Sequence, residues 1–396
     1  MMNDPVILDV KQNGNRVDVT GGPRHLFYEI EGFELPPIEN WGFCVWHMLA
    51  WAMRRGTSIH VAGPMDEGTI SSALRFTRTW ELWNPRRFRF VRITSEGTSP
   101  APKPDRRTDL VMFSGGLDST DMLLRIGRRS NPGLALTVQG FDEELCATSG
   151  FKARLAKTRP LLADLNYNQA VARTNAASVA HDYHSWGLRL MGIGALLSSF
   201  FKEGVFAADR TIEQDIAVGR WGNNHIANGF LRSSDFALTP LYDSISRSEK
   251  AANVAANPIA LNGLTFCNNL LAKPRREAAL NCGVCEKCIR TKAMFAVETG
   301  AIPNIFVDMN PPKLDRLTLN ETESNERVEA AYFIDLYQRA RELGTLGNVP
   351  GLERRFIATF GVKPEPDPLR ARLRDLLPAS VVLKIRAALG RRVVYE

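Results

Sequence analysis

The sequence lacks long apolar runs, and those it has are too short to cross a membrane. The longest, such as Gly42–Met53, fall short of the roughly 20 residues that a transmembrane helix needs. The N-terminus shows no apolar segment followed by a cleavage site, which argues against a signal peptide. We therefore expect a cytoplasmic protein with no membrane partner.

Two common nucleotide-binding motifs are also missing. No Gly-Lys-Ser or Gly-Lys-Thr occurs, which excludes a Walker loop, and no G-x-G-x-x-G follows a predicted strand. Cysteine is scarce, with six in 396 residues. In a cytoplasmic chain so few cysteines indicate metal binding or chemistry rather than a disulfide framework.

The charge balance is basic without being extreme. Fifty Lys and Arg residues against 43 Asp and Glu give a net charge of +7, and the 44% hydrophobic content is that of an ordinary globular protein. Such a balance suits a polyanionic partner or an enzyme that handles nucleotides. The basic residues are spread along the chain with a modest excess near the C-terminus, so a nucleic-acid partner is considered but not favoured.

The first 100 residues are expected to form a small α+β domain. "RRFRFVRI", Arg86–Ile93, alternates like a strand with one polar face, and the Pro- and Ser-rich stretch Thr94–Arg107 indicates a linker. The cluster of Trp80, Trp83, Arg86 and Arg87 could stack on bases. Packing of an aromatic helix end on a sheet is the favoured interpretation.

From residue 108 to 300 strands and helices alternate, and a helical extension is expected over 301–396. Strands are predicted at Asp109–Phe113, Leu134–Gln139, Ala170–Thr174 and Gly204–Ala207. The alternation predicts an α/β fold with a parallel sheet and helices on both faces. Ligands bind outside the carboxyl ends of strands in such sheets.

At one such end stands the sequence Ser114-Gly115-Gly116-Leu117-Asp118-Ser119. It would fit a tight turn with a helix cap, because adjacent glycines allow positive φ and Asp or Ser can cap. It would equally fit a phosphate site, because glycines let the backbone approach a ligand and a helix start offers unpaired N–H groups. Its place at a strand end favours the phosphate site.

This S-G-G-x-D-S loop resembles the pyrophosphate loop of the PP-loop ATP pyrophosphatases. The resemblance implies a Rossmann-like adenine nucleotide α-hydrolase fold, cleavage of ATP between its α and β phosphates, and adenylation of a substrate oxygen. The backbone of Ser114–Leu117 and the Ser119 hydroxyl would then cradle pyrophosphate, and Asp118 would help to hold Mg²⁺. Val138 would contact adenine, and Lys250 belongs to a matching segment, Pro240–Lys250.

Four of the six cysteines form a C-x14-C-x2-C-x2-C pattern, namely Cys267, Cys282, Cys285 and Cys288. Four thiolates suffice for one closed tetrahedral zinc site with no open position for water. The alternatives are four independent cysteines or a redox pair, which the two-residue spacings make less favoured. We therefore expect a zinc knuckle over residues 267–288.

A PP-loop followed by C…CGxCxxC-x-R resembles the 7-cyano-7-deazaguanine synthase (QueC) family over roughly residues 109–295. The gap before Cys282 is longer than is usual there, and the first 100 and last 95 residues have no counterpart in the compact enzyme. The chain therefore resembles an enlarged QueC-like protein. Such proteins occur in antiphage defence operons, where activation is thought to modify another macromolecule, so a protein acceptor is a further implication.

The resemblance implies an AMP-forming ligase that binds ATP and a small heteroaromatic acid, of 7-deazaguanine type, for attack by ammonia or an amine. Candidate substrate residues are Asp209, His225 and Arg290, which would supply hydrogen bonds and a cation. Two alternatives stay open: a tRNA-modifying enzyme with the same activation step, and a non-catalytic nucleotide-binding scaffold.

Overall fold

The computed structural model describes residues 3–100, 105–141, 143–179, 183–219, 221–267, 281–319 and 328–361. The chain divides into two compact units, Met1–Leu352 and Glu353–Glu396. Most of the segment between the first and second cysteines of the expected knuckle, and residues 362–396 of the expected helical extension, lie outside the described residues. Helix α13 (Leu352–Phe360) begins at the last residue of the first unit, and in the second unit its Phe356 and Phe360 rings are tilted by 47° with centroids 5.0 Å apart.

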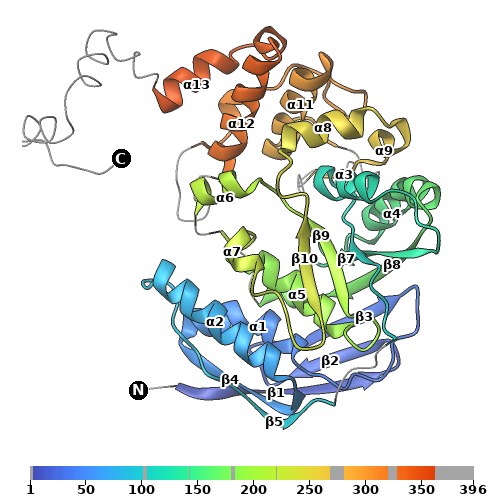
Figure 1. The fold of residues 1–396 in the computed structure, drawn as a ribbon, viewed down its shortest axis with the longest axis vertical. Helices are drawn as coiled ribbons and strands as arrows, with labels where there is room; N and C mark the ends of the chain where they lie inside the picture. Colours follow the sequence, from blue (N-terminus) through green and yellow to red (C-terminus); the bar gives the residue numbers. More distant parts are fainter. Residues whose placement is uncertain are drawn as a thin grey trace, which may run out of the picture. The chain divides into compact units, whose positions relative to one another are not determined.

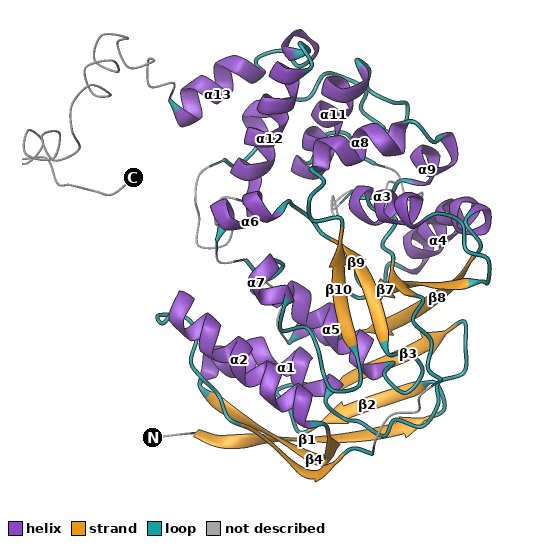
Figure 2. Cartoon of the chain, in the orientation of Figure 1, coloured by secondary structure: helices purple, strands orange, loops and turns teal. Residues whose placement is uncertain are grey.

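A ten-stranded sheet organises the first unit, in the order β10-β9-β6-β7-β8-β3-β2-β1-β4-β5 (Figure 2). Its strands are β1 (Asn3–Asn13), β2 (Arg16–Thr20), β3 (Leu26–Glu31), β4 (Thr57–Met65), β5 (Ile93–Thr98), β6 (Leu110–Met112), β7 (Gly133–Gln139), β8 (Tyr167–Thr174), β9 (Glu203–Ala207) and β10 (Ala237–Leu241). The pairings among β8, β3, β2 and β1 are antiparallel, and the others are parallel. The expected α/β class is confirmed, with a mostly parallel sheet.

Helices cover both faces of this sheet (Figure 1). The α-helices described in this unit are α1 (Phe43–Arg55), α2 (Glu67–Trp83), α3 (Leu117–Ile126), α4 (Thr148–Asp164), α5 (Trp186–Leu196), α6 (Ile212–Val218), α7 (His225–Asn228), α8 (Arg247–Ala255), α9 (Pro258–Gly263), α11 (Glu286–Thr299) and α12 (Val328–Glu342). Helix α5 packs against α1, whereas α8 packs against α3, α11 and α12 beyond the carboxyl end of β10.

The strands of the first 100 residues continue the central sheet. Strand β3 pairs with β8, with Tyr28 opposite Thr174 and Glu31 opposite Val171. The boundary expected near residue 100 therefore does not coincide with a break in the sheet.

The strand predicted at Arg86–Ile93 is wrong, because β5 begins only at Ile93. The amides of Arg87 and Phe88 both donate to the carbonyl of Asn84, which makes a tight turn. The Arg89 amide then donates to the Met53 carbonyl at the end of α1 rather than to a strand. The alternation of Arg and Phe here reflects a loop that buries Phe88, not a pleated strand.

The strand order in the parallel half of the sheet reverses at β6. The chain runs from β6 to β7 and β8 on one side, and then places β9 and β10 on the other side of β6. Loops leaving the carboxyl ends of the two strands at such a reversal diverge, which opens a crevice where ligands bind.

A buried polar network joins α2 to the loop before β10. Asp66 caps α2 by accepting from the Thr69 amide at 2.7 Å, and it also accepts from the Ser234 amide at 2.6 Å. The Asn40 side-chain amide bridges Asp66 and Asp235 at 2.8 and 2.7 Å. Burial alone would raise the pKa of Asp66, but these hydrogen bonds hold the pKa below its ordinary value of 3.8.

Replacing Asp66 by alanine should lower the free energy of unfolding by about 2–4 kcal/mol, because it removes a helix cap and leaves buried donors unpaired. Urea unfolding at pH 7 measures the change. Because the folded pKa is depressed, the loss relative to wild type should shrink as pH falls below 3.8. Asp4→Ala, at an exposed position, is the control and should change stability by less than about 0.5 kcal/mol.

Candidate active site and metal centre

Hydrogen bonds of two serines within the loop hold together the segment between β6 and α3. The Ser114 amide donates to the Ser119 Oγ at 3.3 Å, the two hydroxyls lie 3.2 Å apart, and the Gly116 amide donates to the Ser114 Oγ at 3.3 Å. Gly115 has φ +74, a conformation that favours glycine. The loop delivers the chain into α3 at Leu117, where the first amides of a helix have no partner within the helix.

Gly115→Ala should destabilise the loop, whereas Gly116→Ala should not. A Cβ on Gly115 would lie 2.8 Å from side-chain atoms of Thr158 and Thr265, in addition to the cost of positive φ. Gly116 has extended backbone at φ −78, and its Cβ would meet only the Ser114 Oγ, at 3.2 Å. We expect Gly115→Ala to cost about 1–3 kcal/mol in urea unfolding. Equal effects of the two substitutions would contradict this geometry.

A pocket of about 120 Å³ lies at the carboxyl ends of β6, β7 and β9, at the reversal of strand order. Its polar wall consists of Ser114, Gly116, Asp118, Ser119, Arg154 and Asp209. Its apolar wall consists of Met112, Phe113, Leu136, Val138, Phe141, Trp186, Leu190, Phe206 and Ala207. An apolar pocket with a few convergent polar groups is the usual form of a small-molecule site, here suited to a flat ring beside an anionic group.

Asp118 is the most constrained carboxylate of this pocket. Its Oδ2 lies 3.0 Å from an Arg247 nitrogen, and its Oδ1 lies 3.7 Å from the Lys250 Nζ. The Oδ1 atom is buried yet accepts no hydrogen bond. A carboxylate oxygen left without a hydrogen bond is a fitting ligand for a hard cation such as Mg²⁺.

Three arginines surround the ring of Tyr332, which α12 supplies. The guanidinium carbons of Arg290, Arg247 and Arg210 lie 4.3, 5.2 and 5.8 Å from its centroid. Burial alone would lower the pKa of Arg247, but Asp118 and further acidic groups hold that pKa above its ordinary value. Arg247 therefore stays charged beside the loop.

The structure brings several of the predicted residues together. Of the predicted loop, Ser114, Gly116, Asp118 and Ser119 line the pocket, as do Val138 and Asp209. Asp209 also accepts from the Asn223 side-chain amide at 2.9 Å. Gly115 and Leu117 support the loop without lining this pocket.

Other predicted residues lie elsewhere. Lys250 is 1% exposed behind Asp118 and donates to the Ala208 carbonyl at 2.5 Å. Arg290 is buried in α11 and pairs with Glu329 of α12. The side chain of His225 is 56% exposed at the start of α7, 3.6 Å from Asp243. None of the three lines the pocket.

Arg247, Trp186 and Tyr332 were not predicted from the sequence as residues of the site. A signal for Arg247 was present, since Ser246 and Glu249 form a capping box that starts α8 directly after β10. Trp186 lines the pocket from the first position of α5. No local pattern marks Tyr332, because only the packing of α12 brings it to this site.

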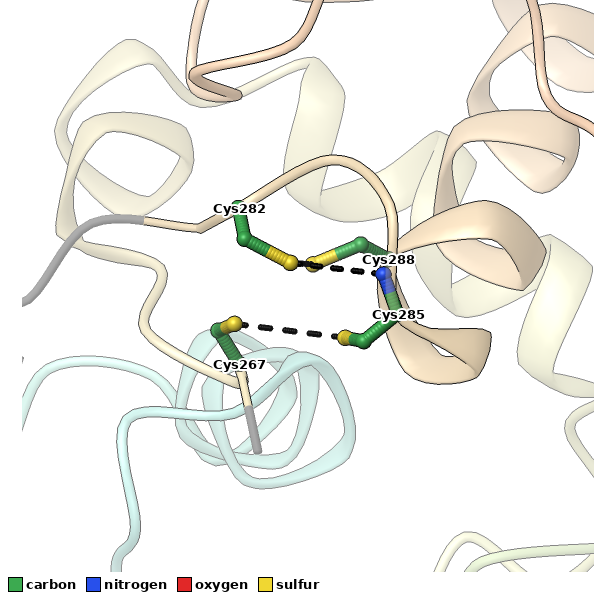
Figure 3. A group of neighbouring side chains, drawn as sticks. All are labelled: Cys267, Cys282, Cys285 and Cys288. Atoms are coloured by element: carbon green, nitrogen blue, oxygen red, sulfur yellow. Dashed lines mark hydrogen bonds between the residues drawn. The ribbon is translucent and has the colours of Figure 1, made fainter. Parts of the chain in front are cut away.

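The four cysteines converge as expected (Figure 3). All four Sγ atoms lie within 4.8 Å of one another, with Cys267–Cys285 at 3.9 Å and Cys282–Cys288 at 3.8 Å. A tetrahedron with Zn–S bonds of about 2.3 Å has S···S edges of about 3.8 Å, so these distances fit zinc. The described cluster could therefore hold a metal such as zinc.

Backbone amides around Cys282 stabilise its thiolate form. The amides of Val284 and Cys285 donate to its Sγ at 3.4 and 3.3 Å. Hydrogen bonds from Cys267 and the other two thiols hold the pKa of Cys282 well below its ordinary value. Gly283, at φ +80, allows this turn, because a Cβ there would lie 2.3 Å from the Asp308 carbonyl oxygen.

The chain matches no known family model, no curated protein and no solved structure. None of the helices in the described part of the chain has the length and hydropathy needed to cross a bilayer. The site must therefore be interpreted from its own geometry.

Proposed function

We propose that the protein is an ATP-dependent ligase of the PP-loop type, which adenylates a carboxylate and releases pyrophosphate. The acid is a small heteroaromatic one, of 7-deazaguanine type, and the acyl adenylate is consumed by ammonia or an amine. One observation carries the proposal. The Ser114–Ser119 loop lies at the reversal of strand order and lines a pocket whose other wall is apolar.

The pocket has the parts that adenylation requires. The loop and the first amides of α3 would donate to phosphate oxygens, and the Ser119 hydroxyl would add a further donor. Asp118 and Asp209 are the carboxylates in the lining that would hold Mg²⁺, which would neutralise charge on the phosphates. Trp186 and Phe206, whose rings lie 5.8 Å apart, and Val138 offer an apolar surface to a ring.

The proposed reaction has two steps. The acid's carboxylate oxygen forms a bond to the α-phosphorus, and the bond from that phosphorus to the bridging oxygen breaks with departure of pyrophosphate. The nitrogen nucleophile then attacks the acyl carbon, loses a proton, and AMP leaves. Arg247, held beside Asp118, would stabilise the negative charge on the departing pyrophosphate.

The four-cysteine cluster has a structural role in this proposal. Four thiolates saturate a tetrahedral ion, so the cluster would offer no open position for substrate. It would fix the start of α11, since Cys285 is the N-cap residue of that helix and Cys288 lies in its first turn. Arg290 follows in α11 and reaches Tyr332, which links the knuckle to the arginines beside the pocket.

The test is product analysis with purified protein, ATP, Mg²⁺ and a panel of heteroaromatic acids that includes 7-carboxy-7-deazaguanine. We expect AMP and pyrophosphate that depend on the acid, with a mass increase of the nitrogen acceptor. Release of ADP would contradict the proposal, and so would a lack of acid-dependent AMP across the panel.

A further inference from the structure

An unusual share of the positive charge lies in residues 54–92. This segment holds eight arginines, no lysine and three carboxylates, so it carries +5 of the chain's net +7. Six of these arginines are exposed, and the five that lie on or after the second helix of the segment form what we call the arginine patch: Arg75, Arg78, Arg86, Arg89 and Arg92.

Contacts at the ends of α1 and α2 bring the patch together. The Arg89 amide donates to the Met53 carbonyl at 2.9 Å, and the Ile59 amide donates to the Arg92 carbonyl at 2.8 Å. Both arginines therefore lie where α1 ends and β4 begins. The Arg78 guanidinium lies 5.1 Å from the centroid of Phe90, two residues before Arg92.

The remaining two members extend this group. Arg75 lies one turn before Arg78 on the same face of α2, and its guanidinium stands 5.2 Å from the Phe230 ring. Arg86 belongs to the turn between α2 and β5 that follows Asn84. The patch thus extends from α2 into the loop that follows it. Helices α1 and α2 are seen side by side in Figure 1.

The arginines of the patch lie close together in sequence without neutralising partners. Several arginines elsewhere do pair with carboxylates, as in Arg107–Asp109, Arg125–Asp121 and Arg339–Glu298. Across the described ranges, no carboxylate forms an ion pair with any of the five patch arginines. Neighbouring unneutralised charges repel one another, and this repulsion disfavours the folded state.

We propose that the arginine patch binds the phosphodiester backbone of a nucleic acid. The guanidinium fork matches phosphate oxygens through paired hydrogen bonds, and arginine is more weakly hydrated than lysine. Arg75 and Arg78 lie three residues apart on α2, which places their Cβ atoms about 5–6 Å apart, so their guanidinium groups can reach neighbouring phosphates of one strand. The patch therefore suits a linear array of phosphates.

One feature favours nucleic acid over an acidic protein, and a second indicates how the nucleic acid would be bound. Protein interfaces need an apolar centre, and the one large apolar side chain exposed within residues 54–92 of the described structure is Leu82. Phe88 is buried and Phe90 is half-buried beneath arginines, so neither offers an open ring for bases. Binding should therefore follow the backbone and be independent of sequence. This inference does not depend on the proposed ATP chemistry.

Fluorescence anisotropy with labelled 20-nucleotide single-stranded DNA, the matching duplex and an RNA of equal length tests this. We expect micromolar or tighter binding at 50 mM salt, weakening steeply by 200 mM because counterions are released. Changing Arg78, Arg86, Arg89 and Arg92 together to Gln should weaken binding at least tenfold and reduce the salt slope by about 3. Arg78→Gln with Arg86→Gln alone should weaken it about threefold.

The matched control removes the same charge elsewhere. Arg24, Arg159, Arg232 and Arg316 are exposed, and their joint change to Gln should alter affinity by less than about twofold. An equal loss of affinity in this control would show that net charge alone explains the effect, and would overturn the proposal. Absence of binding at 50 mM salt would also overturn it. Competition by a polyglutamate peptide as effective per charge as DNA would assign the patch to an acidic protein instead.

Discussion

Asp118→Asn should reduce AMP formation by on the order of 10²–10³-fold while the protein stays folded. The amide keeps the shape of the side chain and can still accept a hydrogen bond from Arg247. It carries no charge, so it would hold Mg²⁺ poorly and leave the phosphates less well neutralised. Product analysis under saturating ATP measures the rate, and thermal unfolding checks the fold.

The control for this substitution is Asp164→Asn, which removes the same charge from the exposed end of α4. It should leave the rate within about twofold of wild type. An Asp118→Asn protein with AMP formation within threefold of wild type would show that this carboxylate neither binds the metal nor assists the reaction.

Cys288→Ser should release the metal and unfold the knuckle. Structural zinc contributes on the order of 10 kcal/mol in zinc-finger peptides, and a fully buried Cys288 leaves a serine no solvent with which to replace the lost Zn–S bond. We expect about one zinc per chain in the wild type by metal analysis, well under half of that in the variant, and a lowered Tm.

Cys146→Ser is the matched control, because Cys146 is exposed and lies outside the cluster. It should retain the metal and the wild-type Tm. The conclusion that these thiols bind zinc would be contradicted by wild-type protein without zinc, or by a Cys288→Ser protein that keeps one zinc per chain.

Local patterns predicted much of this molecule because local physics determines those parts. The strand predicted at Leu134–Gln139 matches β7, and the loop Ser114–Ser119 lies at a strand end as expected. The close spacing of Cys282, Cys285 and Cys288 indicated a shared site, and their sulfur atoms do converge with that of Cys267. In each case a few consecutive residues carry the signal.

The parts that could not be predicted depend on contacts between distant segments. Tyr332 joins the arginines only because α12 packs against α8 and α11. His225 looked suitable for a substrate site by its proximity to Asp209 in sequence, yet the turn into α7 leaves its side chain exposed. The pairing of β3 with β8 likewise has no local signal, since register between distant strands is set by the completed core.

The β3–β8 pairing affects how the protein folds during its synthesis on the ribosome. Residues 26–31 emerge long before residues 167–174, so the edge of β3 stays open while more than a hundred further residues are translated. An open strand edge is a template for association with other chains, and contacts of such long sequence separation form slowly. The nascent N-terminal half should therefore be a chaperone client. The linker expected over Thr94–Arg107 is only partly a linker, because β5 extends to Thr98. A fragment that begins at residue 108 would present β8 as a bare edge and aggregate unless residues 1–100 are supplied in trans.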